Sequence, residues 1–93
     1  MAANMVTGLQ SRGIYVFAKH FALNDQETNR GGVCIWSNEQ AMREIYLRAF
    51  EVAIHNVTGD GLNQLGLTGI MESYNRIGTS MVGYSYAMLT QVL

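Results

Sequence analysis

The sequence has no proline, one cysteine and few charged residues. The single cysteine, Cys34, excludes an internal disulfide framework and a multi-cysteine zinc site. Six Lys and Arg stand against seven Asp and Glu, so the chain lacks the basic excess with which nucleic-acid-binding proteins neutralise phosphates. No apolar run approaches the roughly 20 residues of a membrane span, and residues 1–6 lack the basic and long apolar stretches of a signal peptide. These absences predict a chain with neither nucleic-acid nor membrane partners.

The composition is mostly hydrophobic. Of the 93 residues 48% are hydrophobic and 14% are charged, whereas an ordinary soluble domain has about 25% charged residues. A chain of this length makes one small domain, which buries roughly 60–70% of its unfolded surface. So apolar a composition in so short a chain predicts that part of the apolar surface contacts something else.

Hydrophobic periodicity predicts alternating helices and strands. Over 38–57 apolar residues recur at the spacing of an amphipathic helix, and Ser37 with Gln40 forms a capping-box pattern at its start. The continuous apolar run Ile14–Ala18 is typical of a strand covered on both faces. In chain order we expect helix 1–12, strand 14–18, polar loop 19–37, helix 38–57, strand 68–71, an irregular glycine-containing segment at 78–83 and helix 84–93. This order is typical of βαβ units, so the sequence predicts an α/β fold with two parallel strands and flanking helices.

Polar residues follow both predicted strands. Lys19, His20 and Phe21 come after the first strand, and residues 71–76 come at the end of the second. Function gathers at the carboxyl ends of parallel strands, so we expect these side chains to converge on one pocket. Two strands alone cannot form a stable parallel sheet, so the sequence also predicts a slice of a larger α/β domain.

Four sequence blocks in register resemble glycoside hydrolase family 3, in the N-terminal (β/α)₈-like barrel domain of its β-glucosidase-type members. They cover nearly the whole chain, in the family's order and spacing. The blocks are Lys19-His20-Phe21, Asn24-x-Gln26-Glu27-x-x-Arg30, Arg43-Glu44-Ile45-Tyr46-Leu47 with Phe50, and Met71-x-Ser73-Tyr74-Asn75. The resemblance implies a partial TIM-like barrel, with residues 1–93 as one incomplete domain. It is compatible with Met1 being an internal residue of a longer chain.

The resemblance implies a retaining, exo-acting β-glycosidase that removes terminal non-reducing sugar residues without a cofactor or metal. Such enzymes use a carboxylate nucleophile and a second carboxylic acid about 5–5.5 Å apart. In the family, the residues that match Lys19 and His20 bind hydroxyls of the glycone in the −1 subsite, and those that match Met71 and Tyr74 line it. The implied partners are a carbohydrate substrate, either a β-glucoside or an oligosaccharide, and the remainder of the barrel with the domain that follows it.

Neither catalytic carboxylate of the family is expected in these residues. The family nucleophile lies in a Ser-Asp-Trp motif on a later strand, and the acid/base comes from further along the chain. The nearby pair Asp25 and Glu27 fixes no geometry for hydrolysis because only one residue separates the two in a loop. We therefore interpret Glu27 and Arg30 as an ion pair that holds the loop, and not as sugar ligands or catalytic groups.

Two other functions fit the sequence. In one, the chain is a non-catalytic fragment that folds only by docking to the rest of a barrel or to a partner chain. In the other, it is a free-standing α/β binding module, which unpaired sheet edges disfavour. A strand with a Ser-Asp-Trp motif elsewhere in the parent polypeptide would favour the enzyme over these two alternatives.

Overall fold

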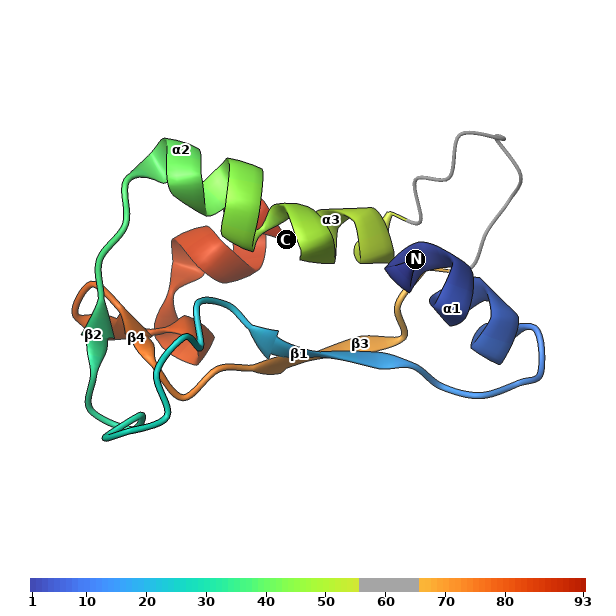
Figure 1. Ribbon diagram of the computed structural model, residues 1–93, viewed down its shortest axis with the longest axis horizontal. Coiled ribbons are helices and arrows are strands. Elements are labelled where there is room, and N and C mark those ends of the chain that lie inside the picture. Colours follow the sequence, from blue (N-terminus) through green and yellow to red (C-terminus); the bar gives the residue numbers. More distant parts are fainter. Residues whose placement is uncertain (56–65) are drawn as a thin grey trace.

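A pair of parallel strands runs along the middle of the fold (Figure 1). The computed structural model of the chain describes residues 1–55 and 66–93. Strand β1 (Phe17–Phe21) pairs in parallel with β3 (Gly69–Glu72). The predicted α/β class and the parallel pairing are therefore confirmed.

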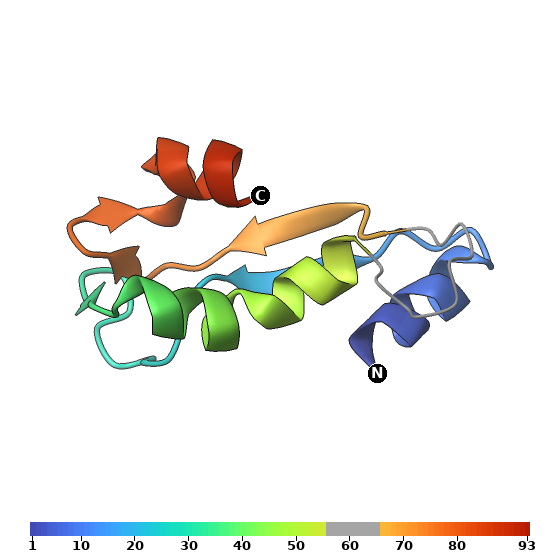
Figure 2. The ribbon, with the colours of Figure 1, turned by 90° about the horizontal axis from the view of Figure 1, so that it is seen from above.

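Helical segments accompany this strand pair, and most of them lie on one side of it. They are α1 (Ala2–Gln10), α2 (Glu39–Ala41), the π-helical turn η1 (Met42–Tyr46), α3 (Arg48–Ile54), the 3₁₀ turn η2 (Val82–Tyr84) and the π-helical η3 (Ala87–Val92). Both α3 and η3 lie above the strands in Figure 1, and the view from above shows α3 running along β1 (Figure 2). Helices are present near both ends of the chain, as the sequence predicts.

Strand β1 lies three residues later than the apolar run that predicted it. The run begins at Ile14, yet Ile14 and Tyr15 are exposed, and the contact with β3 begins where Thr68 N donates to Val16 O at 3.0 Å. The prediction of a strand at 14–18 was thus wrong in its bounds, because the partner strand fixes the extent of pairing and local hydrophobicity does not. Lys19 and His20 consequently lie within the strand instead of following it.

The predicted helix 38–57 is present as far as Ile54 but is interrupted by a π-helical turn; residues 56 and 57 lie outside the described part of the chain. Leu47 N donates to Met42 O at 2.8 Å, five residues back, so one extra residue enters the turn. The insertion shifts the buried face, which buries Leu47 and exposes Ile45. The helix is also capped by Asn38, whose Oδ1 accepts from the main-chain N of residue 41 at 2.7 Å, and not by Ser37 as predicted.

A second, smaller sheet was not predicted. Strand β2 (Cys34–Ile35) pairs in parallel with β4 (Arg76–Ile77), which forms a hairpin with β5 (Ser80–Met81). Gly78 turns this hairpin with a φ of +60°, a conformation that favours glycine, beneath the ring of Trp36. Strands of two residues carry too little periodicity to be recognised, so the sequence predicted an irregular segment.

The core lies where the end of β1 meets α3 and η3. Phe21 packs edge-to-face on Phe50 of α3, with ring centroids 5.1 Å apart. The buried members of this cluster are Phe21, Ala22, Leu23, Leu47, Val82 and Met88. The core thus immobilises the residues that directly follow Lys19 and His20.

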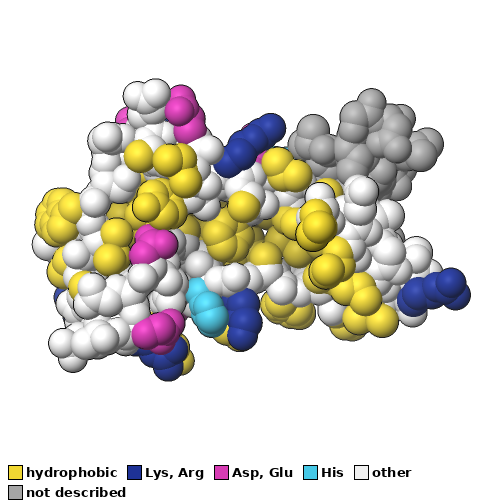
Figure 3. Space-filling view, viewed as in Figure 1, with side chains coloured by type: hydrophobic (Ala, Val, Ile, Leu, Met, Phe, Trp, Pro, Cys, Tyr) yellow, Lys and Arg dark blue, Asp and Glu magenta, His cyan; other side chains and the backbone are white. Residues whose placement is uncertain are grey.

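The face of the strand pair away from the helices is open. Phe17 on this face is 61% exposed, and its ring covers Gly69 on the neighbouring strand, in the space that a Cβ would occupy. Hydrophobic side chains are spread over much of the surface that Figure 3 displays. So many exposed apolar groups fit the expectation that part of this surface contacts something else.

Candidate functional site

The predicted substrate-binding residues lie at one end of the strand pair. In the parallel pair, Ala18 is paired with Ile70 and Phe21 with Glu72, so the register shifts by one residue between these two pairs. Lys19 and His20 on β1 therefore lie together opposite Met71 on β3. Lys19 is exposed and His20 half-buried, while Met71 and Tyr74 are 51% and 54% exposed. The pairing thus brings residues 19–20 and residues 71–74, which are about 50 residues apart in sequence, to the same accessible end of the strand pair.

Two buried polar residues fix the chain on either side of Tyr74. Ser73 Oγ donates to the carbonyl of Ala22 at 2.8 Å, and Asn75 Nδ2 donates to the carbonyl of Leu23 at 3.2 Å. Ser73 and Asn75 are completely buried. The segment that follows β3 is therefore tied to the segment that follows β1, and Tyr74 projects outward between the two anchors.

The roles of Ser73 and Asn75 were not predicted from the sequence. Both appear in the family-like block, but a short polar residue near a strand end is as typical of a solvated turn as of a buried anchor. Only the long-range contact with residues 22 and 23 distinguishes the two.

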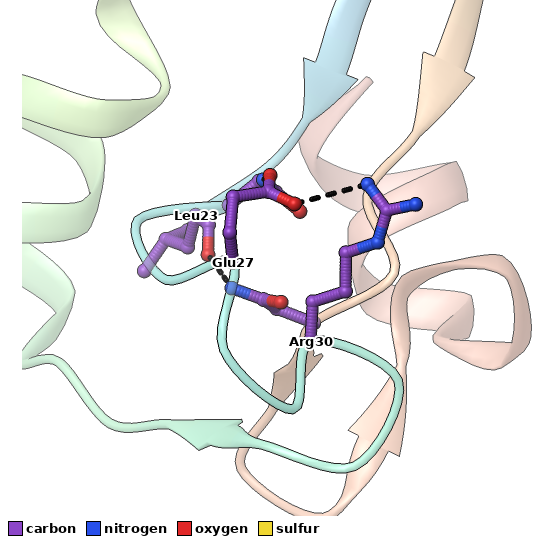
Figure 4. A network of polar contacts seen from close by, with 5 residues as sticks. Leu23, Glu27 and Arg30 are labelled. Atoms are coloured by element: carbon purple, nitrogen blue, oxygen red, sulfur yellow. Dashed lines mark hydrogen bonds and ion pairs between the residues drawn. The ribbon is translucent and has the colours of Figure 1, made fainter.

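A chain of polar contacts leads from the loop after β1 to Tyr74. Asn24 Nδ2 donates to Glu27 Oε1 at 2.8 Å, and Arg30 Nη1 donates to Glu27 Oε2 at 3.0 Å. In Figure 4 the loop folds so that the carboxylate of Glu27 faces the guanidinium of Arg30. That guanidinium also lies over the ring of Tyr74, 4.8 Å from its centroid. The ion pair of Glu27 and Arg30 therefore contacts the segment that follows β3.

Hydrogen bonding from Asn24 holds the pKa of Glu27 below its ordinary value, and the charges of Arg30 and His20 act in the same direction. A carboxyl group whose pKa is lowered by folding stabilises the fold above its ordinary pKa. That contribution is lost as the pH falls through the lowered value. At neutral pH Glu27 is thus ionised and its contacts with Asn24 and Arg30 are intact.

Glu72, at the end of β3, lies on the opposite side of the strand from Met71, because successive strand residues face opposite ways. Its carboxylate packs directly against Gly83. Glu72 is therefore directed away from Met71.

The described residues outside this edge hold a separate hollow. A cavity of about 240 Å³ is lined by residues of β1, α3 and η3, and none of Lys19, His20, Met71 and Tyr74 lines it. Among the described residues no group of three or more His, Cys, Asp and Glu side chains could hold a metal ion. In the same part of the chain, no helix is both long and apolar enough to cross a bilayer.

The chain is similar in sequence and in structure to known proteins. No model of a protein family matches the chain. The chain is 39% identical over 92 residues to a probable β-glucosidase H of Aspergillus flavus, which covers 99% of the chain and 10% of that protein. The chain superimposes on β-glucosidase 3B from Thermotoga neapolitana with a TM-score of 0.84 and 35% identity, over 98% of this chain and 12% of that one. The chain is homologous to part of these β-glucosidases.

A second solved structure gives the same result. The β-glucosidase from Kluyveromyces marxianus matches 95% of this chain and 10% of its own, with a TM-score of 0.79 and 32% identity. The resemblance to the β-glucosidase-type members of glycoside hydrolase family 3 is confirmed. This β-glucosidase-like chain spans about a tenth of the length of the curated relatives it matches.

Proposed function

We propose that residues 1–93 form two successive strand-and-helix units of the (β/α)₈-type barrel of a β-glucosidase-like glycosidase, as one incomplete domain. In such barrels the strands are parallel, helices cover their outer side, and side chains from the strands fill the interior. The parallel pairing of β1 with β3 and the helices α3 and η3 on one side support this arrangement. The open face that carries Phe17 then becomes the barrel interior.

Within that enzyme, the segment supplies the glycone-binding half of the −1 subsite. The observation that carries this proposal is the register that brings Lys19 and His20 level with Met71 at the carboxyl ends of the strands, where barrel enzymes have their active sites. A Lys ammonium and a His imidazole donate directional hydrogen bonds to adjacent ring hydroxyls. Polar contacts of this kind discriminate strongly against sugars that lack the hydroxyl.

The chemistry itself is assigned to residues outside this chain. We propose retaining hydrolysis through a covalent glycosyl intermediate, with both catalytic carboxylates supplied by the rest of the enzyme. Two carboxylates near the proposed subsite have other contacts: Glu27 is held by Asn24 and Arg30, and Glu72 packs against Gly83. The proposed substrate is a β-glucoside or an oligosaccharide with a terminal non-reducing residue.

The test is an exchange of segments. In a full-length β-glucosidase of known structure, the residues that match this chain are replaced by these 93 residues, which gives the exchanged enzyme. We expect it to fold and to hydrolyse an aryl β-glucoside, because 98% of the chain superimposes on the solved relative.

A folded exchanged enzyme without hydrolysis would contradict the enzymatic role. It would favour the second candidate function, a non-catalytic segment that only docks to a barrel, which the exposed apolar surface also fits. Circular dichroism and the unfolding temperature of the exchanged and parent enzymes control for folding. A matching double variant of the parent enzyme, at the positions equivalent to Lys19 and His20, tests the subsite if the exchange does not fold.

A further inference from the structure

The guanidinium of Arg30 makes two contacts of different kinds. It is paired with Glu27 at 3.0 Å and lies over the ring of Tyr74 at 4.8 Å from the centroid. Both contacts are made while the Arg30 side chain is only 48% exposed. Arg30 therefore connects a loop after β1 to an aromatic ring after β3.

The loop that presents Arg30 is itself closely bonded. Arg30 N donates to the carbonyl of Glu27 at 3.2 Å, and the carbonyl of Asn29 accepts from the main-chain N of Gly32 at 2.8 Å. Asn29 adopts a φ of +57°, which asparagine tolerates better than most residues. These hydrogen bonds order the turn on which Arg30 lies.

The ring of Tyr74 needs such a contact to be oriented. The buried anchors Ser73 and Asn75 fix the backbone on both sides of it, but the side chain remains 54% exposed. An exposed aromatic side chain can rotate about χ1 and χ2 unless a neighbour covers one face. The guanidinium of Arg30 covers that face.

We propose that Arg30 is a positioning residue: it orients the ring of Tyr74 by stacking on it, with Glu27 holding the guanidinium in place. This inference rests on the proposed function, in which Tyr74 lines the sugar site. The planar guanidinium matters because it stacks on an aromatic face, whereas a Lys ammonium is a compact, strongly hydrated charge. Arg30 therefore acts through Tyr74 and not as a sugar ligand.

The test is a double-mutant cycle in the exchanged enzyme, with Arg30→Ala, Tyr74→Ala and the double variant. We expect Arg30→Ala to lower kcat/KM for an aryl β-glucoside roughly fivefold. In the Tyr74→Ala background the same substitution should change kcat/KM by less than about twofold, because the ring that Arg30 orients is gone. Additive losses would overturn the proposal, because Arg30 would then act independently of Tyr74.

Two further variants sharpen the result. Arg30→Lys keeps the charge and loses the planar stack, so it should resemble Arg30→Ala; full activity of the lysine variant would overturn the proposal. The matched control is Arg48→Ala, since Arg48 also pairs with a Glu three residues away, at 2.8 Å, and its side chain is 54% exposed. If Arg30→Ala fails to fold, Glu27→Gln replaces it in the cycle, with a smaller loss and the same expected lack of additivity.

The two proposals fail in different ways. If Tyr74→Ala and His20→Ala both leave the kinetics unchanged, the subsite assignment is wrong. If those variants are impaired but Arg30 and Tyr74 act additively, the subsite stands and only the positioning role is wrong.

Discussion

Replacing His20 with alanine is expected to lower kcat/KM of the exchanged enzyme for an aryl β-glucoside by roughly a hundredfold or more. His20 is half-buried at the end of β1, level with Met71, where its imidazole can donate to a sugar hydroxyl. Without the imidazole, the hydroxyl of a bound sugar loses its hydrogen-bond partner, and a polar group left unpaired in a binding site costs more than the loss of an exposed hydrogen bond. Steady-state kinetics of the purified variant measure the effect.

His55→Ala is the matched control for this experiment. His55 is an exposed histidine that follows α3, and it lines the cavity beside that helix and not the proposed sugar site. We expect its kinetics to equal those of the unsubstituted exchanged enzyme. Equal kinetics for His20→Ala would remove His20 from the site, provided that both variants unfold at the same temperature as the parent.

The isolated 93-residue chain is expected to show no cooperative thermal transition as a monomer. Within residues 1–55 and 66–93 the central sheet has two strands, so β1 and β3 each leave one edge unpaired. Large apolar groups are also exposed, with Tyr15 at 80% and Phe17 at 61%. A chain in this condition aggregates or stays molten, because burial of its apolar surface needs further protein.

Calorimetry and near-ultraviolet circular dichroism of the isolated chain measure this outcome. Binding of a hydrophobic dye without a near-ultraviolet signal would be the expected signature. A sharp transition of a monomer, with near-ultraviolet dichroism, would contradict it and favour the free-standing binding module. The same residues inside the exchanged enzyme serve as the comparison, since there hydrogen exchange of β1 and β3 should be slow.

The sequence predicted the parts of the fold that depend on local patterns. The parallel strand pair, the long amphipathic helix and the helices near both ends of the chain are all present. The predicted strands were wrong where a segment distant in sequence determines the bounds or the existence of a strand. Hydrogen bonding with residue 68 sets where β1 begins, and the two-residue strand at Cys34 exists only because Arg76 and Ile77 lie beside it.

The helix over 39–54 shows a different limit. Counting at 3.6 residues per turn assumes an uninterrupted helix, and the single extra residue at Met42–Tyr46 breaks that assumption. Leu47, which an uninterrupted helix would place off the apolar stripe, is therefore buried in the core. No pattern in the sequence marks this insertion, because it depends on how the helix packs over Phe21.

At the site, the family resemblance predicted Lys19, His20, Met71 and Tyr74 as substrate-binding residues. The structure shows which neighbouring residues hold this part of the chain in place. The buried anchors Ser73 and Asn75 and the placement of the Arg30 guanidinium over Tyr74 are contacts between segments far apart in the sequence. Side-chain identity alone cannot predict such contacts. Arg30, Ser73 and Asn75 belong to the family-like blocks, but the blocks do not predict which residues they contact.

In the hydrogen bonds that join the two strand ends, the donor and acceptor residues tolerate substitution to different degrees. Ser73 and Asn75 bond to main-chain carbonyls, so the side chains of Ala22 and Leu23 can vary within the limits of their buried volume while the acceptors stay in place. The donors have no such freedom, since an aliphatic replacement leaves a buried carbonyl unpaired. A library that diversifies the lining residues of this edge for new sugars should therefore keep residues 73 and 75 unchanged.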